Sequence, residues 1–207
     1  MSCTQNRFPV ALFTDTVAVI LGSWTFDDLA GNPDPQGWTT IDLTAQVDTF
    51  FHVDAFSGLD GGSFGRLVPI SGARSLWCGA RPSDATVCGY ASLPGYGNYW
   101  EQVFESRTFS VPEDAVVEYH LVMDVEAGYD YVRLEYLSSD AIWTTVSSFT
   151  GIGDFVVNDT IPYAQINGEL KLRFRVSSDP GWSDEDGVRD SDGAAIIDDI
   201  TVSSSGT

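Results

Sequence analysis

The segment from Ala115 to Leu137, AVVEYHLVMDVEAGYDYVRLEYL, decides the fold class. Apolar and polar residues alternate in it up to Val125, which is typical of a β-strand with one buried face. The alternation resumes from Tyr129 to Leu137, after a short turn around Gly128. The segment therefore predicts two strands joined by a tight turn.

The same kind of pattern recurs on both sides of this segment, whereas helical spacing of apolar residues is never kept for three turns. Short β-rich runs separated by turn residues predict roughly nine or ten strands in total. We expect an all-β fold, a jelly-roll-like sandwich of two antiparallel sheets. The further predicted strands are 16–26, 46–53, 73–77, 101–109, 142–149, 170–176 and 194–202.

Length and composition favour one folded domain. The chain has 207 residues, of which 43% are hydrophobic and 13% aromatic, which is enough to form a substantial core. We expect the sandwich over residues 24–207 and an N-terminal leader or peripheral strand over residues 1–23. The apolar run from Val17 to Leu21 is far shorter than the ~20 residues that span a bilayer, so no membrane insertion is predicted.

The charge balance restricts the partners. The chain has 30 Asp and Glu against 10 Lys and Arg, a formal net charge of −20. Nucleic-acid binding depends on cationic side chains that neutralise phosphates, so we expect no nucleic-acid partner. Two interpretations of the acids stay open: a solvated surface that aids solubility, or clusters that bind a hard cation such as Ca²⁺.

Three acid-rich segments are the candidates for calcium binding. One is the loop from Ser178 to Gly193, another is the turn from Val125 to Asp130, and the third comprises the acid pairs near the two ends of the domain. Closely spaced carboxylates supply the oxygen ligands that Ca²⁺ requires, although a solvated acidic turn is the alternative. The predicted ligands are Asp27, Asp28, Glu126, Asp130, Asp179, Asp184, Asp186, Asp192 and Asp198.

Aromatic residues gather in or beside the predicted loops. Exposed rings can stack on sugar rings while neighbouring polar groups bind the hydroxyls. The alternative is that these large side chains fill the ends of the core. The candidate ligand-binding residues are Trp77, Tyr96, Asn98, Tyr99, Trp100 and Trp182.

The cysteines indicate an oxidising compartment. Cys78 and Cys88 flank a short loop, and a disulfide between them would stabilise the fold by about 2.5–3 kcal/mol in the chain-entropy model. Two separate buried thiols are the alternative. We expect the protein to be extracellular or on a cell surface.

Six short blocks of the sequence, taken together, resemble a known kind of module: 77–79, 95–100, 126–130, 178–179, 184–187 and 195–200. Their order and spacing between Trp24 and Val202 are similar to those of jelly-roll modules of secreted bacterial proteins, including the accessory domain of immune-inhibitor-A-type metalloproteases, and more distantly to those of MAM domains. The resemblance implies a β-sandwich with structural calcium that acts as a non-catalytic appendage. The zinc motif HExxH of the proteases is absent from this sequence.

Function is predicted at the level of a class. The two histidines, His52 and His120, stand in no recognisable nucleophile or zinc motif. We therefore expect a non-catalytic, calcium-stabilised binding or adhesion module whose partner is a glycan or a cell-surface protein. A spacer or accessory domain of a larger secreted enzyme, with neighbouring domains in the same chain, is the first alternative. A two-carboxylate glycoside hydrolase is the second.

Overall fold

The computed structural model describes residues 19–25, 38–42, 50–59, 67–84 and 90–204, and every structural statement below concerns these residues. The first elements are β1 (Val19–Trp24), β2 (Trp38–Asp42), β3 (Phe51–Asp54), β4 (Ser75–Cys78), β5 (Glu101–Ser106), β6 (Phe109–Ser110) and β7 (Ala115–Asp124). They are followed by β8 (Tyr131–Leu137), β9 (Trp143–Phe149), β10 (Ile152–Ile161), α1 (Tyr163–Ile166), β11 (Glu169–Leu170), β12 (Leu172–Ser177) and β13 (Ala195–Ser204).

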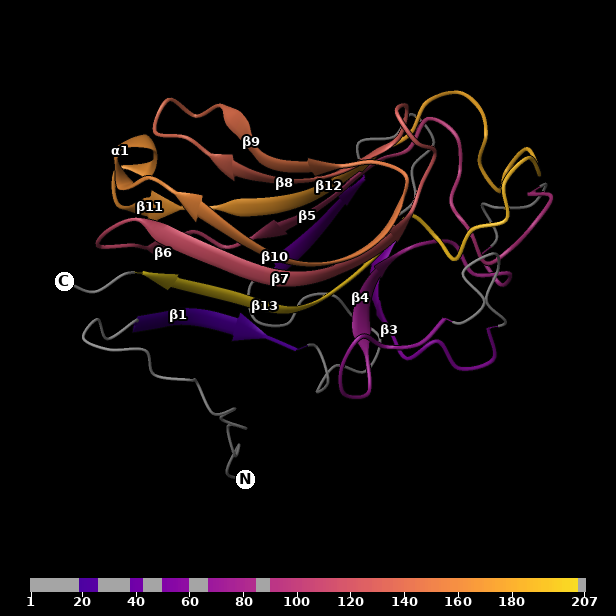
Figure 1. The fold of residues 1–207 in the computed structure, drawn as a ribbon, viewed down its shortest axis with the longest axis horizontal. Coiled ribbons are helices and arrows are strands. Elements are labelled where there is room, and N and C mark those ends of the chain that lie inside the picture. The colour runs from indigo at the N-terminus through magenta and orange to yellow at the C-terminus, as the bar shows by residue number, and fades with distance from the viewer. Residues whose placement is uncertain (1–18, 26–37, 43–49, 60–66, 85–89, 205–207) are drawn as a thin grey trace.

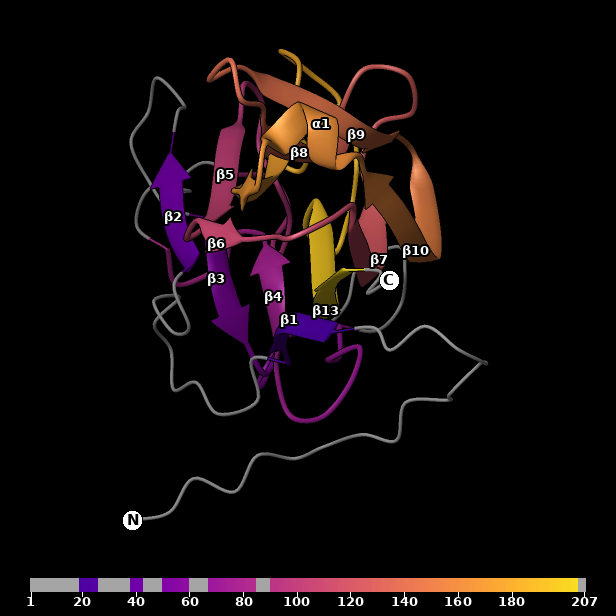
Figure 2. The same cartoon turned by 90° about the vertical axis from the view of Figure 1, so that its left-hand side faces the viewer.

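Two antiparallel sheets form the molecule, and the predicted sandwich is confirmed (Figures 1 and 2). The first sheet, sheet A, has the order β10-β7-β13-β4-β3, with β1 also paired to β13. The second, sheet B, has the order β2-β5-β12-β8-β9, and β6 and β11 form a small separate pair. The helix α1 has four residues, and in the described part of the chain no helix is long and apolar enough to cross a membrane.

Strand β13 pairs with three other strands of sheet A. One of its edges pairs with β7, and the other pairs with β4 in the first half and with β1 in the second half. A bulge separates the halves, because Asp199 and Ile200 together face one residue of β7. Asp199 adopts a φ of 51° there. The extra residue shifts the alternation by one, so that Ala195 and Ile197 before the bulge and Ile200 and Val202 after it are all buried.

The carboxylate next to the bulge is buried as well. Asp198 accepts hydrogen bonds from the Ser75 hydroxyl (2.7 Å) and from the Asp199 backbone N–H (2.8 Å). The sequence predicts Asp198 as a calcium ligand, but its carboxylate joins β13 to β4 and has protein donors around it. Burial raises the pKa of Asp198 to about 6, although the hydrogen bond from Ser75 acts in the opposite direction.

Apolar side chains of the two sheets meet between them. On β7 every second residue from Ala115 to Met123 is buried, and on β12 the buried residues are Leu172, Phe174 and Val176. Trp38 of β2 stacks on Phe104 of β5 with ring centroids 4.9 Å apart, and such aromatic pairs add to the stabilisation from burial. This core holds the sheets in a fixed relation to each other.

A second apolar cluster lies on the outer face of sheet A. It consists of Phe56, Leu67, Trp77 and Ile196. Trp77 is fully buried, and its indole N–H donates to the Asp192 carbonyl oxygen (2.8 Å). Phe56 and Leu67, which lie between β3 and β4 in the sequence, therefore cover part of this face.

The cost of core truncation can be measured with a matched pair of valines. Val117 of β7 is fully buried, whereas Val156 of the neighbouring edge strand β10 is 83% exposed. We expect Val117→Ala to lower the free energy of unfolding by about 2 kcal/mol, because it removes buried methyl groups and leaves a cavity. Val156→Ala should change it by less than about 0.5 kcal/mol. Equal effects of the two substitutions in urea unfolding would contradict the assignment of the core face of β7.

The buried carboxylate of Asp198 predicts a pH dependence of stability. Folded Asp198 binds a proton below about pH 6, but the unfolded chain does so only below about pH 4. The folded state therefore holds more protons between these values, so this contribution to stability is complete below about pH 4 and is lost as the pH rises through 6. We expect Asp198→Asn, which mimics the protonated group, to reduce the fall in Tm between about pH 5 and about pH 7. Asp140→Asn, at an exposed position, is the control, and a wild-type pH profile for Asp198→Asn would refute the prediction.

Candidate functional site

Three loops meet at one end of the sandwich, which we call the loop end: residues 90–100, 125–130 and 178–193. Backbone hydrogen bonds join the first loop to the third, for example from Asp184 N to Tyr96 O (3.1 Å) and from Tyr99 N to Asp179 O (2.8 Å). The second loop is joined to both through the Asp130 carboxylate, which accepts from the Tyr96 hydroxyl and the Asp179 backbone N–H. In Figure 1 they lie beyond the same ends of the strands, opposite α1. Most of the predicted metal and aromatic residues belong to these loops.

The buried side chain of Asp184 joins two of the loops at the loop end. Its carboxylate is fully buried and accepts hydrogen bonds from the backbone N–H groups of Tyr96 (2.9 Å) and Ser191 (2.8 Å) and from the Ser191 hydroxyl (2.5 Å). Gly95 is required beside it, because a Cβ at that position would lie 2.1 Å from the Asp184 Cγ. Burial raises the pKa of Asp184 to about 6, against the effect of these hydrogen bonds. The carboxylate that the sequence predicts as a metal ligand thus holds two loops together through protein donors.

Asp186 and Asp192, two further predicted ligands in the long loop, do not lie in a group of carboxylates that could hold an ion among the described residues. Asp186 accepts hydrogen bonds from the backbone N–H groups of Trp182 (2.7 Å) and Val188 (3.0 Å), and so closes its own turn. Asp192 is buried, with 6% of its surface exposed. Asp27 and Asp28 lie outside the described residues.

Three predicted metal ligands do come together at the loop end. Glu126, Asp130 and Asp179 each offer a carboxylate oxygen, and these oxygens lie within 4.8 Å of one another. Asp130 is fully buried and accepts hydrogen bonds from the Tyr96 hydroxyl (2.6 Å) and the Asp179 backbone N–H (2.8 Å). Burial, together with the nearby charge of Asp179, raises the pKa of both Glu126 and Asp130. The chain has thus placed three mutually repelling acids side by side, which we call the acidic cluster.

The aromatic residues predicted to bind a ligand differ in their burial. Trp77 and Tyr96 are fully buried and Trp100 is 2% exposed, so these rings fill the core and cannot stack on a ligand. Tyr99 and Trp182 are 65% and 59% exposed. Both have a positive φ, 58° and 64°, a conformation that is unfavourable for bulky residues and is concentrated at functional sites.

The remaining predicted residues can be placed only in part. The backbone N–H of Asn98 donates to Glu185 (2.8 Å), which joins two loops of the loop end. Cys78 is buried on β4, whereas Cys88 lies outside the described residues. The disulfide between them therefore stays a prediction.

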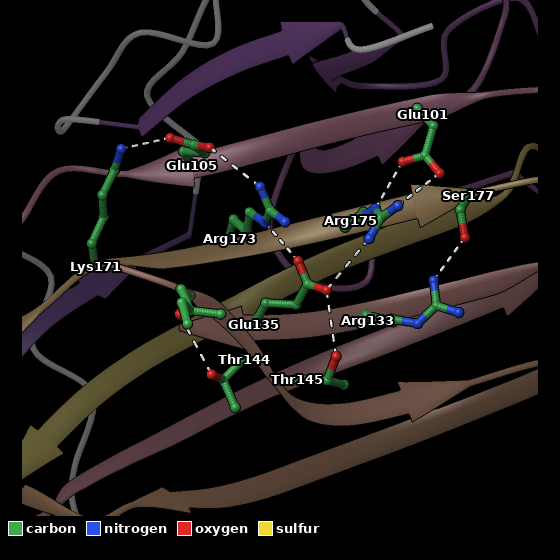
Figure 3. A network of polar contacts seen from close by, with 11 residues as sticks. Glu101, Glu105, Arg133, Glu135, Thr144, Thr145, Lys171, Arg173, Arg175 and Ser177 are labelled. Carbon is green, nitrogen blue, oxygen red and sulfur yellow. Dashed lines mark hydrogen bonds and ion pairs between the residues drawn. The ribbon is translucent and has the colours of Figure 1, made fainter. Parts of the chain in front are cut away.

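The outer face of sheet B carries a polar network that sequence reasoning did not single out. Because Leu172, Phe174 and Val176 point into the core, Arg173 and Arg175 between them point outward. Their neighbours on β5 and β8 have the same orientation, since directly paired residues share a face. Figure 3 shows the charged residues of this outer-face network, which are Glu101, Glu105, Arg133, Glu135, Lys171, Arg173 and Arg175.

Ion pairs hold the outer-face network in place. Glu135 accepts from Arg173 Nε (2.5 Å), and Glu101 binds Arg175 through two hydrogen bonds of 2.7 and 2.8 Å. Lys171 Nζ donates to Glu105 (2.6 Å). The side chains of Glu135 and Arg173 are only 5% and 11% exposed, so loss of either partner would leave a poorly solvated charge. The network is therefore rigid, as its members fix one another.

Aromatic rings flank the network on both sides. The guanidinium carbon of Arg173 lies 4.1 Å from the ring centroid of Trp143, and that of Arg133 lies 4.4 Å from the centroid of Tyr131. Trp143 pairs with Leu137 at the far end of β8 from Tyr131. Six residues of a strand correspond to about 20 Å, so the polar and aromatic groups form an elongated surface.

The charge of this surface differs from that of the molecule. Its four cationic and three anionic side chains give a net charge of +1, in a chain with a net charge of −20. The alternation of Tyr131, Arg133 and Glu135 along β8 was the sequence signal that could have identified it. The pattern became specific only when the neighbouring β12 placed Arg173 and Arg175 beside it.

Comparison with known proteins identifies the fold. No protein-family model matches the sequence, and no curated protein is similar to it in sequence. The structure resembles the K1 cleaved adhesin domain of Lys-gingipain from Porphyromonas gingivalis W83, with a TM-score of 0.56, 12% identity and coverage of 91% of this chain and 99% of that domain. The K3 cleaved adhesin domain of the same protein matches with a TM-score of 0.54 and 12% identity, and the match covers 90% of this chain and 100% of that domain.

A structure from another class of proteins has a similar fold. The N-terminal tandem of two CBM22 domains from Paenibacillus barcinonensis Xyn10C, where CBM stands for carbohydrate-binding module, matches with a TM-score of 0.51 and 11% identity. The match covers 95% of this chain and 48% of the tandem, in line with one of two modules. The resemblance to immune-inhibitor-A and MAM modules stays an interpretation of the sequence. This chain is a β-sandwich module with a fold like those of adhesin domains and carbohydrate-binding modules.

Proposed function

We propose that this protein is a non-catalytic module that binds glycans on the outer face of sheet B and acts outside the cell or on its surface. The observation that carries the proposal is the outer-face network with Trp143 and Tyr131 beside it. The resemblance of the fold to adhesin domains and carbohydrate-binding modules supports the same class of function.

The chemistry of the surface suits a sugar chain. Sugar hydroxyls both donate and accept hydrogen bonds, and the outer-face network offers guanidinium donors next to carboxylate acceptors. Indole and phenol rings bury the apolar C–H faces of sugar rings. Because the ion pairs already fix Arg173, Arg175 and Glu101, binding would immobilise few additional side chains, and less conformational entropy would be lost.

The loop end is a second candidate surface, because Tyr99 and Trp182 expose their rings there. Two exposed aromatic side chains in strained backbone conformations are suited to contact with a ligand or a partner protein. An accessory role beside neighbouring domains is consistent with the tandem arrangement of the CBM22 domains.

We also propose that the acidic cluster binds Ca²⁺. Ca²⁺ takes six to eight oxygen ligands, and Glu126, Asp130 and Asp179 supply several from two adjacent loops. Water or backbone carbonyls would complete the set. A cation would offset the burial and mutual repulsion that raise the pKa of Glu126 and Asp130, and so stabilise the loop end.

The glycan proposal is tested by affinity electrophoresis and calorimetry against a panel of soluble plant and bacterial polysaccharides. We expect Trp143→Ala and Tyr131→Ala to weaken binding at least about tenfold, because each removes a ring that stacks on the sugar. Tyr99→Ala and Trp182→Ala serve as the comparison, since these rings lie at the other surface.

The outcome distinguishes the surfaces. Loss of binding only in the Tyr99 and Trp182 variants would move the site to the loop end. Wild-type protein that binds no glycan of the panel would favour the accessory or spacer role. A circular-dichroism spectrum and Tm close to those of wild type are required of every variant that loses binding.

The calcium proposal is tested by thermal unfolding in excess Ca²⁺ and in excess chelator at equal ionic strength. An ion that binds only the folded state should raise Tm by about 5–10 °C when its concentration is about 100 times its Kd. The double variant Glu126→Gln/Asp179→Asn should lose this shift. The double variant Asp140→Asn/Glu169→Gln removes the same charge at exposed positions and should retain it. A wild-type Tm that does not respond to Ca²⁺ would overturn the proposal.

A further inference from the structure

Arg133 differs from the other cations of the outer-face network in its partners. Lys171, Arg173 and Arg175 each bind a glutamate, and elsewhere Arg81 and Arg189 each bind an aspartate. Arg133 donates through one terminal nitrogen to the Ser177 hydroxyl (2.7 Å) and lies over the Tyr131 ring. In the described part of the chain no carboxylate forms an ion pair with it. This is notable because acids outnumber cations 30 to 10 in the sequence.

The neighbours of Arg133 also distinguish it from the other cations of the network. Its direct cross-strand partner on β12 is Arg175, and like charges in directly opposite positions destabilise a sheet. The nearby carboxylates are engaged with other cations: Arg175 binds Glu101 through two hydrogen bonds and lies 3.7 Å from Glu135, which also binds Arg173. Arg133 is therefore the cation of the network whose charge is not offset by an ion pair within it.

Contacts within the protein fix the orientation of the Arg133 guanidinium, at which an anion would bind. The Ser177 hydroxyl fixes one end and the Tyr131 ring one face. The Tyr131 hydroxyl in turn donates to the Gly128 carbonyl oxygen (2.9 Å), which fixes the ring. Guanidinium has five N–H donors in a planar fork that matches the two oxygens of a carboxylate. A single hydroxyl acceptor satisfies only one of these donors.

We propose that Arg133 recognises the carboxylate of a uronic acid residue in the glycan bound on the outer face of sheet B. The proposal rests on the proposed function and adds the class of ligand to it. The ligand is then a polysaccharide in which acidic residues are combined with neutral ones: Trp143 stacks on a sugar ring, and Arg133, toward the other end of β8, pairs with the acid.

The experiment uses polysaccharides in matched forms. Polygalacturonate, alginate and glucuronoxylan are each compared with their methyl-esterified or carboxyl-reduced forms, because esterification or reduction removes the charge and keeps the backbone. Binding is measured by calorimetry at about 0.15 M salt, at which repulsion from the acidic remainder of the protein is screened beyond about 8 Å. The proteins are wild type, Arg133→Gln, Arg133→Lys and the exposed control Arg107→Gln.

We expect wild type to prefer at least one charged polysaccharide to its neutral form. Arg133→Gln should lower the affinity for that polysaccharide by about 10- to 100-fold, the range for hydrogen bonds to a charged group, and bring it to the level of the neutral form. Arg133→Lys should recover part of the preference, since it keeps the charge and loses the planar fork. Arg107→Gln should behave as wild type.

Each alternative outcome identifies what failed. Binding of neutral polysaccharides that Arg133→Gln leaves unchanged, without a preference for the charged form, would overturn the role of Arg133 and leave the proposed function in place. A preference for sulfated polysaccharides over uronates would overturn the carboxylate assignment. Absence of binding to every form would overturn the proposed function together with this inference.

Discussion

The pairing of β13 with three strands is the constraint on which the rest of the structure depends. A strand that pairs with β7 along its whole length and with β4 and β1 in succession must keep its apolar side chains on one face throughout. The bulge at Asp199 and Ile200 makes this possible, because one additional residue shifts the alternation and leaves Ile197 and Ile200 on the same buried face. Sheet A, and with it the surface on which sheet B packs, follows from this arrangement.

The buried and half-buried carboxylates of this acidic protein differ in their surroundings. Asp184 and Asp198 have protein donors on their oxygens and join segments that are distant in the sequence. Burial of a charge is unfavourable unless hydrogen bonds compensate it, and here the compensating donors come from backbone and serine groups. Asp130 also accepts hydrogen bonds from protein donors, the Tyr96 hydroxyl and the Asp179 backbone N–H. What distinguishes the acidic cluster is the closeness of three carboxylates, Glu126, Asp130 and Asp179, whose negative charges repel one another.

The outer face of sheet B combines a row of ion pairs with aromatic rings at its two ends. A row of ion pairs on a sheet contributes modestly to folding, since exposed pairs are worth little and buried ones must offset desolvation. The same pairs hold planar donors and acceptors at fixed spacing between Trp143 and Tyr131. These features are the basis of the glycan-binding function proposed above, and Arg133, the arginine of the network without a carboxylate partner in it, is the basis of the proposed preference for an acidic ligand.

The sequence alone determined the fold class and the strands with clear alternation, because burial of one face imposes a period of two on segments such as 115–137 and 170–176. It did not reveal β2 or the edge strand β10. The residues of β10 are mostly exposed or half-buried, so the polar residues of this strand resemble those of a loop. Composition likewise indicated that acids and aromatic residues matter, but not which of them share a site. The tertiary structure alone decided that Asp130 belongs to the acidic cluster and Asp184 does not, and that Trp77 is buried whereas Trp182 is exposed. It also brought β8 beside β12, which forms the outer-face network. These are contacts between residues far apart in the chain, and a periodic pattern carries no information about which strands become neighbours.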